Sequence, residues 1–202
     1  MKLGTLKEGG RDGTLIVVSR DLTKAARVTA IAPTMQAALD NWAQKEAPLQ
    51  KVYDDLNAGS AAGAFDFDPA ACASPLPRAY QFVDGSAYLN HVDLVRKARG
   101  ATMPPEFLDD PLMYQAESDA FYGPRDDIPV TSESYGIDME AEVAAVVDDT
   151  AMASSPAQAA SRIRLLMILN DVSLRGLIPA ELAIGFGFLH GKASTAFSPV
   201  DE

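Results

Sequence analysis

Residues 137–147, Ile-Asp-Met-Glu-Ala-Glu-Val-Ala-Ala-Val-Val, are the stretch that decides the fold assigned to this sequence. Its second half is short, apolar and rich in valine, which predicts a β-strand that enters a core. On a strand, Glu140 and Glu142 would point to the same face, roughly 7 Å apart. Two like charges so close are unfavourable unless a cation lies between them. The pair therefore indicates a metal site, and a solvated sheet face is the alternative interpretation.

A second buried strand is predicted over residues 165–169, Leu-Leu-Met-Ile-Leu, which lead directly into Asn170-Asp171. A carboxylate at the end of a buried strand, such as that of Asp171, can be a functional group or a simple turn residue. Before this strand, Ser155-Pro-Ala-Gln158 has the pattern of a capping box with proline at the first helical position. A helix is therefore predicted to begin at Ser155 and run toward Arg164.

The first 78 residues predict a small β-rich unit followed by a linker. Apolar runs at 15–18 and 28–31 indicate strands, and Thr34 has the position of a helix N-cap. Helical spacing continues from Met35 through Leu56, with a break expected at Pro48. Small and polar residues with three prolines predict a linker over 57–78, so the chain is divided into domains 1–75 and 76–202. Residues 100–128 are expected to be rich in loops.

Further candidate groups lie on either side of the glutamate pair. Asp84 and His91 are seven residues apart and would share one face if the segment is helical. His91 could act as a general base beside a metal-bound carboxylate, or it could be a surface histidine. Lys192, among small residues, could be a buried ammonium that stabilises an enolate, or a surface lysine in a turn. A site made only of carboxylate oxygens favours Mg²⁺, Ca²⁺ or Mn²⁺ over zinc.

Composition limits the classes of partner. The chain has 202 residues, 48% of them hydrophobic, and a net charge of −11. No cluster of basic residues stands out, which argues against a nucleic-acid partner, and an acidic surface is a poor match for anionic membranes. Neither a secretory signal nor an apolar run of membrane-spanning length is visible, so a cytoplasmic protein is expected. The single cysteine, Cys72, excludes a disulfide within the chain and a cysteine zinc site.

Taken together, these motifs resemble the fumarylacetoacetate hydrolase family between about residues 80 and 200. The resemblance rests on four segments, namely Asp84-(six residues)-His91, Asp138-Met-Glu-Ala-Glu-Val-Ala, Leu169-Asn-Asp-Val-Ser-Leu-Arg175, and Gly191-Lys192 leading to Ser198-Pro199. The first 75 residues resemble the family's small β-barrel domain more loosely. The resemblance implies an α+β, β-rich fold, with a β-barrel-like N-terminal domain and part of a mixed β-sandwich roll that forms the catalytic domain.

The resemblance also implies roles for individual residues. Asp84, Glu140, Glu142 and Asp171 would hold a divalent metal, Mg²⁺ or Ca²⁺ or else Mn²⁺. His91 would activate water, and Lys192 would lie near the metal and polarise the substrate. Three residues would bind the substrate or hold charge near it: Arg99, Arg175 and Thr195.

The implied reaction is hydrolysis of a carbon–carbon bond in a β-diketo acid such as fumarylacetoacetate or an acylpyruvate, as in aromatic amino acid catabolism. Two alternatives remain, namely decarboxylation, hydration or tautomerisation of a 2-keto acid at the same site, and a non-catalytic metal-binding relative.

Departures from the family leave the substrate open and affect the expected assembly. Gly85 and Ser86 stand where fumarylacetoacetases have aromatic residues, and Ile178 stands near the position of a glutamine that contacts substrate. Family members also continue beyond the Ser-Pro that matches Ser198-Pro199, whereas this chain ends at Glu202. The chain is therefore expected to be truncated relative to the family and to leave sheet edges and apolar surface uncovered. We expect it to self-associate, as a homodimer, or to be poorly active alone.

Overall fold

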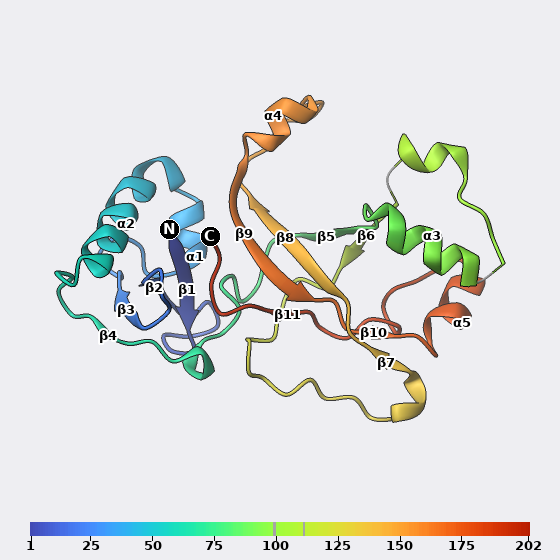
Figure 1. Cartoon of the computed structure of the whole chain (residues 1–202), viewed down its shortest axis with the longest axis horizontal. Coiled ribbons are helices and arrows are strands. Elements are labelled where there is room, and N and C mark those ends of the chain that lie inside the picture. The colour runs from blue at the N-terminus through green and yellow to red at the C-terminus, as the bar shows by residue number, and fades with distance from the viewer. Residues whose placement is uncertain (99, 111) are drawn as a thin grey trace.

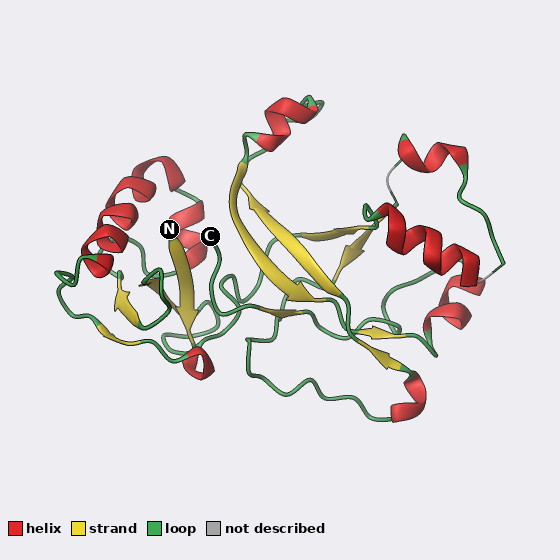
Figure 2. Ribbon diagram, viewed as in Figure 1, coloured by secondary structure: helices red, strands yellow, loops and turns green. Residues whose placement is uncertain are grey.

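A four-stranded antiparallel sheet forms the N-terminal part of the computed structural model, which describes residues 1–98, 100–110 and 112–202 (Figures 1 and 2). The strands lie in chain order: β1 (Lys2–Leu6), β2 (Thr14–Val18), β3 (Lys24–Arg27) and β4 (Phe65–Asp66). Every residue of β2 is buried, because both faces of this strand are covered. The apolar run at 15–18 is therefore confirmed as a strand.

Two helices cover one face of this sheet, α1 (Met35–Leu39) and α2 (Trp42–Asn57). Thr34 is the N-cap of α1, as predicted, and its side chain accepts a hydrogen bond from the Ala37 amide at 3.1 Å. The predicted break at Pro48 is wrong, because α2 continues through it. Leu49 and other apolar residues of α2 pack into the core, which outweighs the hydrogen bond that proline cannot make.

Two other predictions for this region need correction. The strand predicted at 28–31 is not formed, and β3 ends just before it, at Arg27. The Ile31 and Ala32 amides both donate to the Val28 carbonyl, so these residues form a turn. The predicted linker contains β4 and a 3₁₀ helix, η1 (Pro69–Ala71), and the Ala73 amide donates to the Thr5 carbonyl at 2.9 Å. Much of this polar segment is therefore an integral part of the N-terminal unit.

The second part of the chain is built around a long antiparallel hairpin, β8 (Ala141–Val147) and β9 (Ile163–Asn170), with β11 (Ala196–Phe197) on the other side of β9. Two further strand pairs lie near its end, β5 (Phe82–Gly85) with β6 (Met113–Ala116) and β7 (Ile137–Asp138) with β10 (Ser173–Leu174). The remaining elements are α3 (Leu89–Ala98), α4 (Pro156–Ala160), α5 (Ile178–Ala183), η2 (Pro105–Leu108) and η3 (Glu133–Tyr135). In Figure 1 the hairpin lies between the N-terminal sheet and the pair of helices α3 and α5.

The predicted strands of this half are confirmed with changed limits. The run 137–147 divides into β7 and β8, with Met139 and Glu140 between them, and 165–169 lies within β9. The capping box of Ser155 and Gln158 is present, but α4 ends at Ala160 because the chain turns there into β9. The region 100–128, expected to be loops, also contains η2 and β6.

The expected mixed α+β, sheet-rich architecture is confirmed, whereas the described N-terminal strands form an open sheet without barrel closure. One apolar cluster explains this difference. It joins residues of β1, β2 and α2 to side chains from β8, β9 and β11: Val146, Leu165, Met167, Leu169 and Phe197. The face of the small sheet is thus covered by helices and by the hairpin rather than by its own closure. Among the described residues, no helix is both long and apolar enough to cross a membrane.

Candidate metal and catalytic site

Three carboxylates from three separate segments meet at the end of the β8–β9 hairpin. Asp84 lies in β5, Glu142 in β8, and Asp171 directly after β9. One oxygen from each side chain lies within 4.8 Å of the others. Asp171 is almost fully buried, so it is not a solvated turn residue. Of the four carboxylates predicted to bind metal, the fold therefore brings Asp84, Glu142 and Asp171 together in one cluster.

The predicted helical relationship between Asp84 and His91 is wrong. Asp84 belongs to strand β5, where it pairs with Tyr114 of β6, and α3 begins only at Leu89. Pairing with β6 excludes a helix at Asp84 because its backbone belongs to a sheet ladder. His91 reaches the same site from the first turn of α3, so the two residues converge through tertiary packing rather than through helical spacing.

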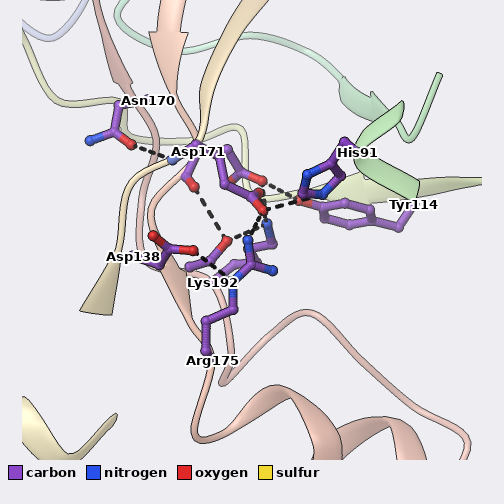
Figure 3. A network of polar contacts seen from close by, with 9 residues as sticks. His91, Tyr114, Asp138, Asn170, Asp171, Arg175 and Lys192 are labelled. Carbon is purple, nitrogen blue, oxygen red and sulfur yellow. Dashed lines mark hydrogen bonds and ion pairs between the residues drawn. The ribbon is translucent and has the colours of Figure 1, made fainter. Parts of the chain in front are cut away.

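Glu140 has a different environment from the other carboxylates. It lies in the break between β7 and β8, where its backbone N–H donates to Asn170 Oδ1 at 3.2 Å. Its side chain accepts hydrogen bonds from Arg175 Nη2 and, at 2.9 Å, from Lys192 Nζ. Arg175 also donates from Nε to Asp138 at 2.9 Å (Figure 3). The Glu140 carboxylate is thus held by two cations beside the three-carboxylate cluster.

Lys192 is the central cation of the site. Its side chain is only 11% exposed, so the alternative of a surface lysine is wrong. The ammonium donates to Ser173 Oγ at 2.7 Å, to Glu140 and to Asp171. Figure 3 shows Lys192 beside Asp171 and Arg175. Burial alone would lower the pKa of Lys192, but its hydrogen bonds to the two carboxylates raise the pKa above its usual value. The lysine therefore stays protonated.

The charges in the cluster do not balance. Burial and the negative charges of Asp84, Asp171 and Glu140 raise the pKa of Glu142 to about 7. Burial also raises the pKa of Asp171 to about 6, against the effect of Lys192. For Glu140, burial is outweighed by Lys192 and Arg175, which lower the pKa to about 2. Excess negative charge on hard oxygen donors fits a divalent cation such as Mg²⁺, Ca²⁺ or Mn²⁺.

His91 and Tyr114 complete the polar side of the site. His91 Nε2 lies 3.8 Å from Glu140 Oε1, and the imidazole is about half exposed. The Tyr114 hydroxyl donates to Asp171 Oδ2 at 3.1 Å, and burial raises the pKa of this hydroxyl above its usual range. The Tyr114 ring contacts the Phe188 ring, with centroids 4.4 Å apart. Sequence reasoning missed both aromatic residues, because neither lies in a periodic segment.

The three residues predicted to contact substrate have different outcomes. Arg175 lies in the polar network through Asp138 and Glu140. Thr195 is buried just before β11, and its carbonyl accepts a hydrogen bond from the Tyr122 amide at 2.9 Å. Arg99 lies outside the described residues.

An open cavity extends over the site. Its lining includes the charged, polar and aromatic residues described above: Asp84, His91, Tyr114, Glu140, Glu142, Arg175, Phe188 and Lys192.

Comparisons with known proteins give the family. The fold is similar to the crystal structure of "a putative HpcE protein from Mycobacterium smegmatis", with a TM-score of 0.61 and 18% sequence identity. That match covers 99% of this chain and 65% of the other, so this chain spans less than two thirds of that protein. No curated protein matches the chain. Residues 1–78 match the family described as fumarylacetoacetase N-terminal domain 2, and residues 81–201 match fumarylacetoacetate (FAA) hydrolase C-terminal. The chain therefore belongs to the fumarylacetoacetate hydrolase family.

Proposed function

We propose that this protein hydrolyses a carbon–carbon bond in a β-diketo acid such as fumarylacetoacetate or an acylpyruvate, with a bound divalent metal. One observation carries the proposal. The carboxylates of Asp84, Glu142 and Asp171 converge within 4.8 Å beside a buried lysine and a half-exposed histidine. Ligands for a hard cation, a general base and a fixed positive charge are the groups that this reaction requires.

The metal would be held by Asp84, Glu142 and Asp171, with Glu140 as a fourth ligand if it exchanges its cationic partners for the ion. When bound, such an ion acts as a Lewis acid toward carbonyl oxygens and orients a chelating substrate. The raised pKa values of Glu142 and Asp171 support this assignment, because a cation would remove the repulsion that causes part of these shifts.

The residues of the chain supply the remaining steps. His91 is accessible and would take a proton from the water whose oxygen attacks one carbonyl carbon of the substrate. Glu140, 3.8 Å from the imidazole, would stabilise the protonated histidine. When the bond breaks, its electron pair stays on the leaving carbon as an enolate, whose charge the Lys192 ammonium would stabilise. A proton returned to that carbon completes the two products.

A substrate other than fumarylacetoacetate is favoured by the environment of Ile178. This side chain is buried and lies against Gly191, at the end of the loop that leads to Lys192. Ile178 lies near the position where fumarylacetoacetases have a glutamine that contacts the substrate. An apolar, buried residue there cannot donate a hydrogen bond to a substrate oxygen. We therefore favour an acylpyruvate, and 2-keto acid decarboxylation, hydration or tautomerisation is the alternative reaction.

The test combines metal binding with turnover. Calorimetry with Mg²⁺, Mn²⁺ and Ca²⁺ would compare the wild type with Glu142→Ala and with Glu46→Ala, a control on the exposed part of α2. Loss of the diketo acid chromophore would follow hydrolysis of fumarylacetoacetate and acylpyruvates in the presence of the tightest-binding metal. We expect the wild type and the Glu46→Ala control to bind the metal and cleave the diketo acid, and Glu142→Ala to do neither. Equal metal affinities in wild type and Glu142→Ala would contradict the site.

A further inference from the structure

The loop that carries Lys192 into the site has a conformation that needs external support. Residues 184–189 follow α5 without regular hydrogen bonding, and Ile184, Phe186 and Leu189 are exposed. Phe188 adopts a φ of +50°, which is uncommon for a bulky side chain and is maintained only when its surroundings enforce it. Some contact must therefore hold this loop in place.

Glu181 supplies that contact from the first turn of α5. Its Oε1 atom accepts hydrogen bonds from the Leu189 and His190 amides at 2.7 and 2.8 Å, and Oε2 accepts one from the Gly191 amide at 2.9 Å. Three successive backbone N–H groups form an anion-binding nest, and here a carboxylate of the same chain occupies it. These bonds lower the pKa of Glu181, so the carboxylate is charged near neutral pH.

The end of this nest is fixed directly before Lys192. The Gly191 carbonyl accepts a hydrogen bond from the Leu174 amide at 2.8 Å, and the Ala193 amide donates to the Val172 carbonyl at 3.2 Å. A Cβ atom at Gly191 would lie 2.5 Å from Ile178 Cγ1, so only glycine fits against α5 here. The backbone at Lys192 is therefore held by α5 on one side and by Val172 and β10 on the other.

We propose that Glu181 is a positioning residue that directs the Lys192 ammonium into the carboxylate cluster and holds Phe188 against Tyr114. Glu181 itself faces the backbone of the loop and acts only through it. The position of Lys192 can be tested whatever reaction the protein catalyses. The inference rests on the proposed function only for its effect on turnover. Loss of Glu181 would leave Asp171 and Glu140 intact but would allow their lysine to move into solvent.

Chemical modification of lysines tests the placement directly. Pulse acetylation followed by peptide mass spectrometry would compare the wild type with Glu181→Gln and with the control Glu46→Gln. Lys2, whose side chain is 17% exposed, is the internal reference. We expect Lys192 to react about tenfold faster relative to Lys2 in Glu181→Gln, the factor typical of losing one hydrogen bond to a charged group. An unchanged ratio would overturn the proposal, as would an equal increase at both lysines, which indicates general loosening.

Amide hydrogen exchange in the wild type provides a second test that needs no folded variant. The Leu189 and His190 amides belong to exposed residues, so only the bonds to Glu181 would slow their exchange. We expect protection of these amides and of the Gly191 amide, and exchange at the intrinsic rate would overturn the inference. If protection and labelling follow the expectation but no diketo acid is cleaved, the proposed function fails and the positioning role stands.

Discussion

His91 Nε2 lies 3.8 Å from Glu140 Oε1, although the two residues are on different elements and 49 positions apart. The same carboxylate accepts hydrogen bonds from Arg175 and Lys192. Glu140 is thus surrounded by cationic or titratable nitrogen atoms, whereas Glu142 faces other carboxylates. The two glutamates of the Glu-Ala-Glu motif therefore have different electrostatic environments.

Neutralising these two glutamates should affect metal binding unequally. Glu142→Gln removes a member of the three-carboxylate cluster and should weaken Mn²⁺ or Mg²⁺ binding at least about tenfold, the effect expected from losing a stabilising term of ~1.4 kcal/mol. Glu140→Gln should weaken it less, because Lys192 and Arg175 already neutralise that carboxylate. Calorimetry under identical buffer conditions measures both affinities. The reverse order would show that Glu140, and not Glu142, is the stronger ligand.

Removing the imidazole should separate chemistry from binding. His91→Gln should lower the rate of diketo acid hydrolysis by about 10²-fold or more, the usual contribution of a general base. Metal affinity should remain that of the wild type, because His91 is outside the three-carboxylate cluster. Steady-state kinetics and calorimetry on one preparation measure both quantities. Unchanged kcat in the variant would exclude His91 as the base.

Removing the buried ammonium should strengthen metal binding while it weakens the metal-free fold. In Lys192→Met, Asp171 and Glu140 lose a cationic partner, so the site becomes more negative and attracts a divalent cation more strongly. Thermal unfolding should show a lower Tm without metal and a larger rise on adding Mg²⁺. Lys97→Met, at an exposed ion pair with Asp93, is the matched control. A weaker metal affinity in Lys192→Met would mean that the lysine orders the ligands more than it repels the ion.

Stability should fall with rising pH because of Asp201. Its side chain is fully buried, neither carboxylate oxygen has a hydrogen-bond partner among the described residues, and burial raises its pKa to about 8. The protonated form is favoured in the folded state, so this stability is complete below about pH 4 and is lost as the pH rises to about 8. Between these pH values, the free energy of unfolding should fall by up to about 1.4 kcal/mol per pH unit.

Asp201→Asn should remove this dependence and stabilise the protein at pH 8 more than at pH 5. Urea unfolding at the two pH values measures the difference, and the Asp66→Asn variant, at an exposed ion pair, serves as the control. Equal stabilisation at both pH values would contradict a titration of Asp201.

The outer face of the hairpin should drive self-association. Val143 and Ile168 pair directly across β8 and β9, and their side chains are 72% and 64% exposed. Apolar side chains in register on an open sheet favour association, so we propose that the predicted homodimer would use this face. Ile168→Lys should shift sedimentation velocity profiles toward the monomer, whereas Leu108→Lys, at an exposed leucine of η2, should not. Association that persists in Ile168→Lys would place the interface elsewhere.

Local sequence determined the strands at the centre of the protein and the chemical character of the site. Valine-rich and leucine-rich runs indicate β8 and β9 because their side chains fill a core, and the capping box at Ser155 acts within one helical turn. The Glu-Ala-Glu spacing and Asp171 at a strand end predicted a group of carboxylates, because alternation along a strand is a short-range property.

Only the tertiary structure decided which of these groups face one another. Asp84 reaches the cluster through pairing of β5 with β6, which are separated in the chain by α3 and η2. The interruption at Glu140 turns that side chain toward Arg175 and Lys192, and Glu181 holds the loop before Lys192 through backbone amides that no sequence pattern reveals. Burial and the sign of neighbouring charges depend on which distant segments pack together, so they set the pKa values and the roles that residue spacing alone left open.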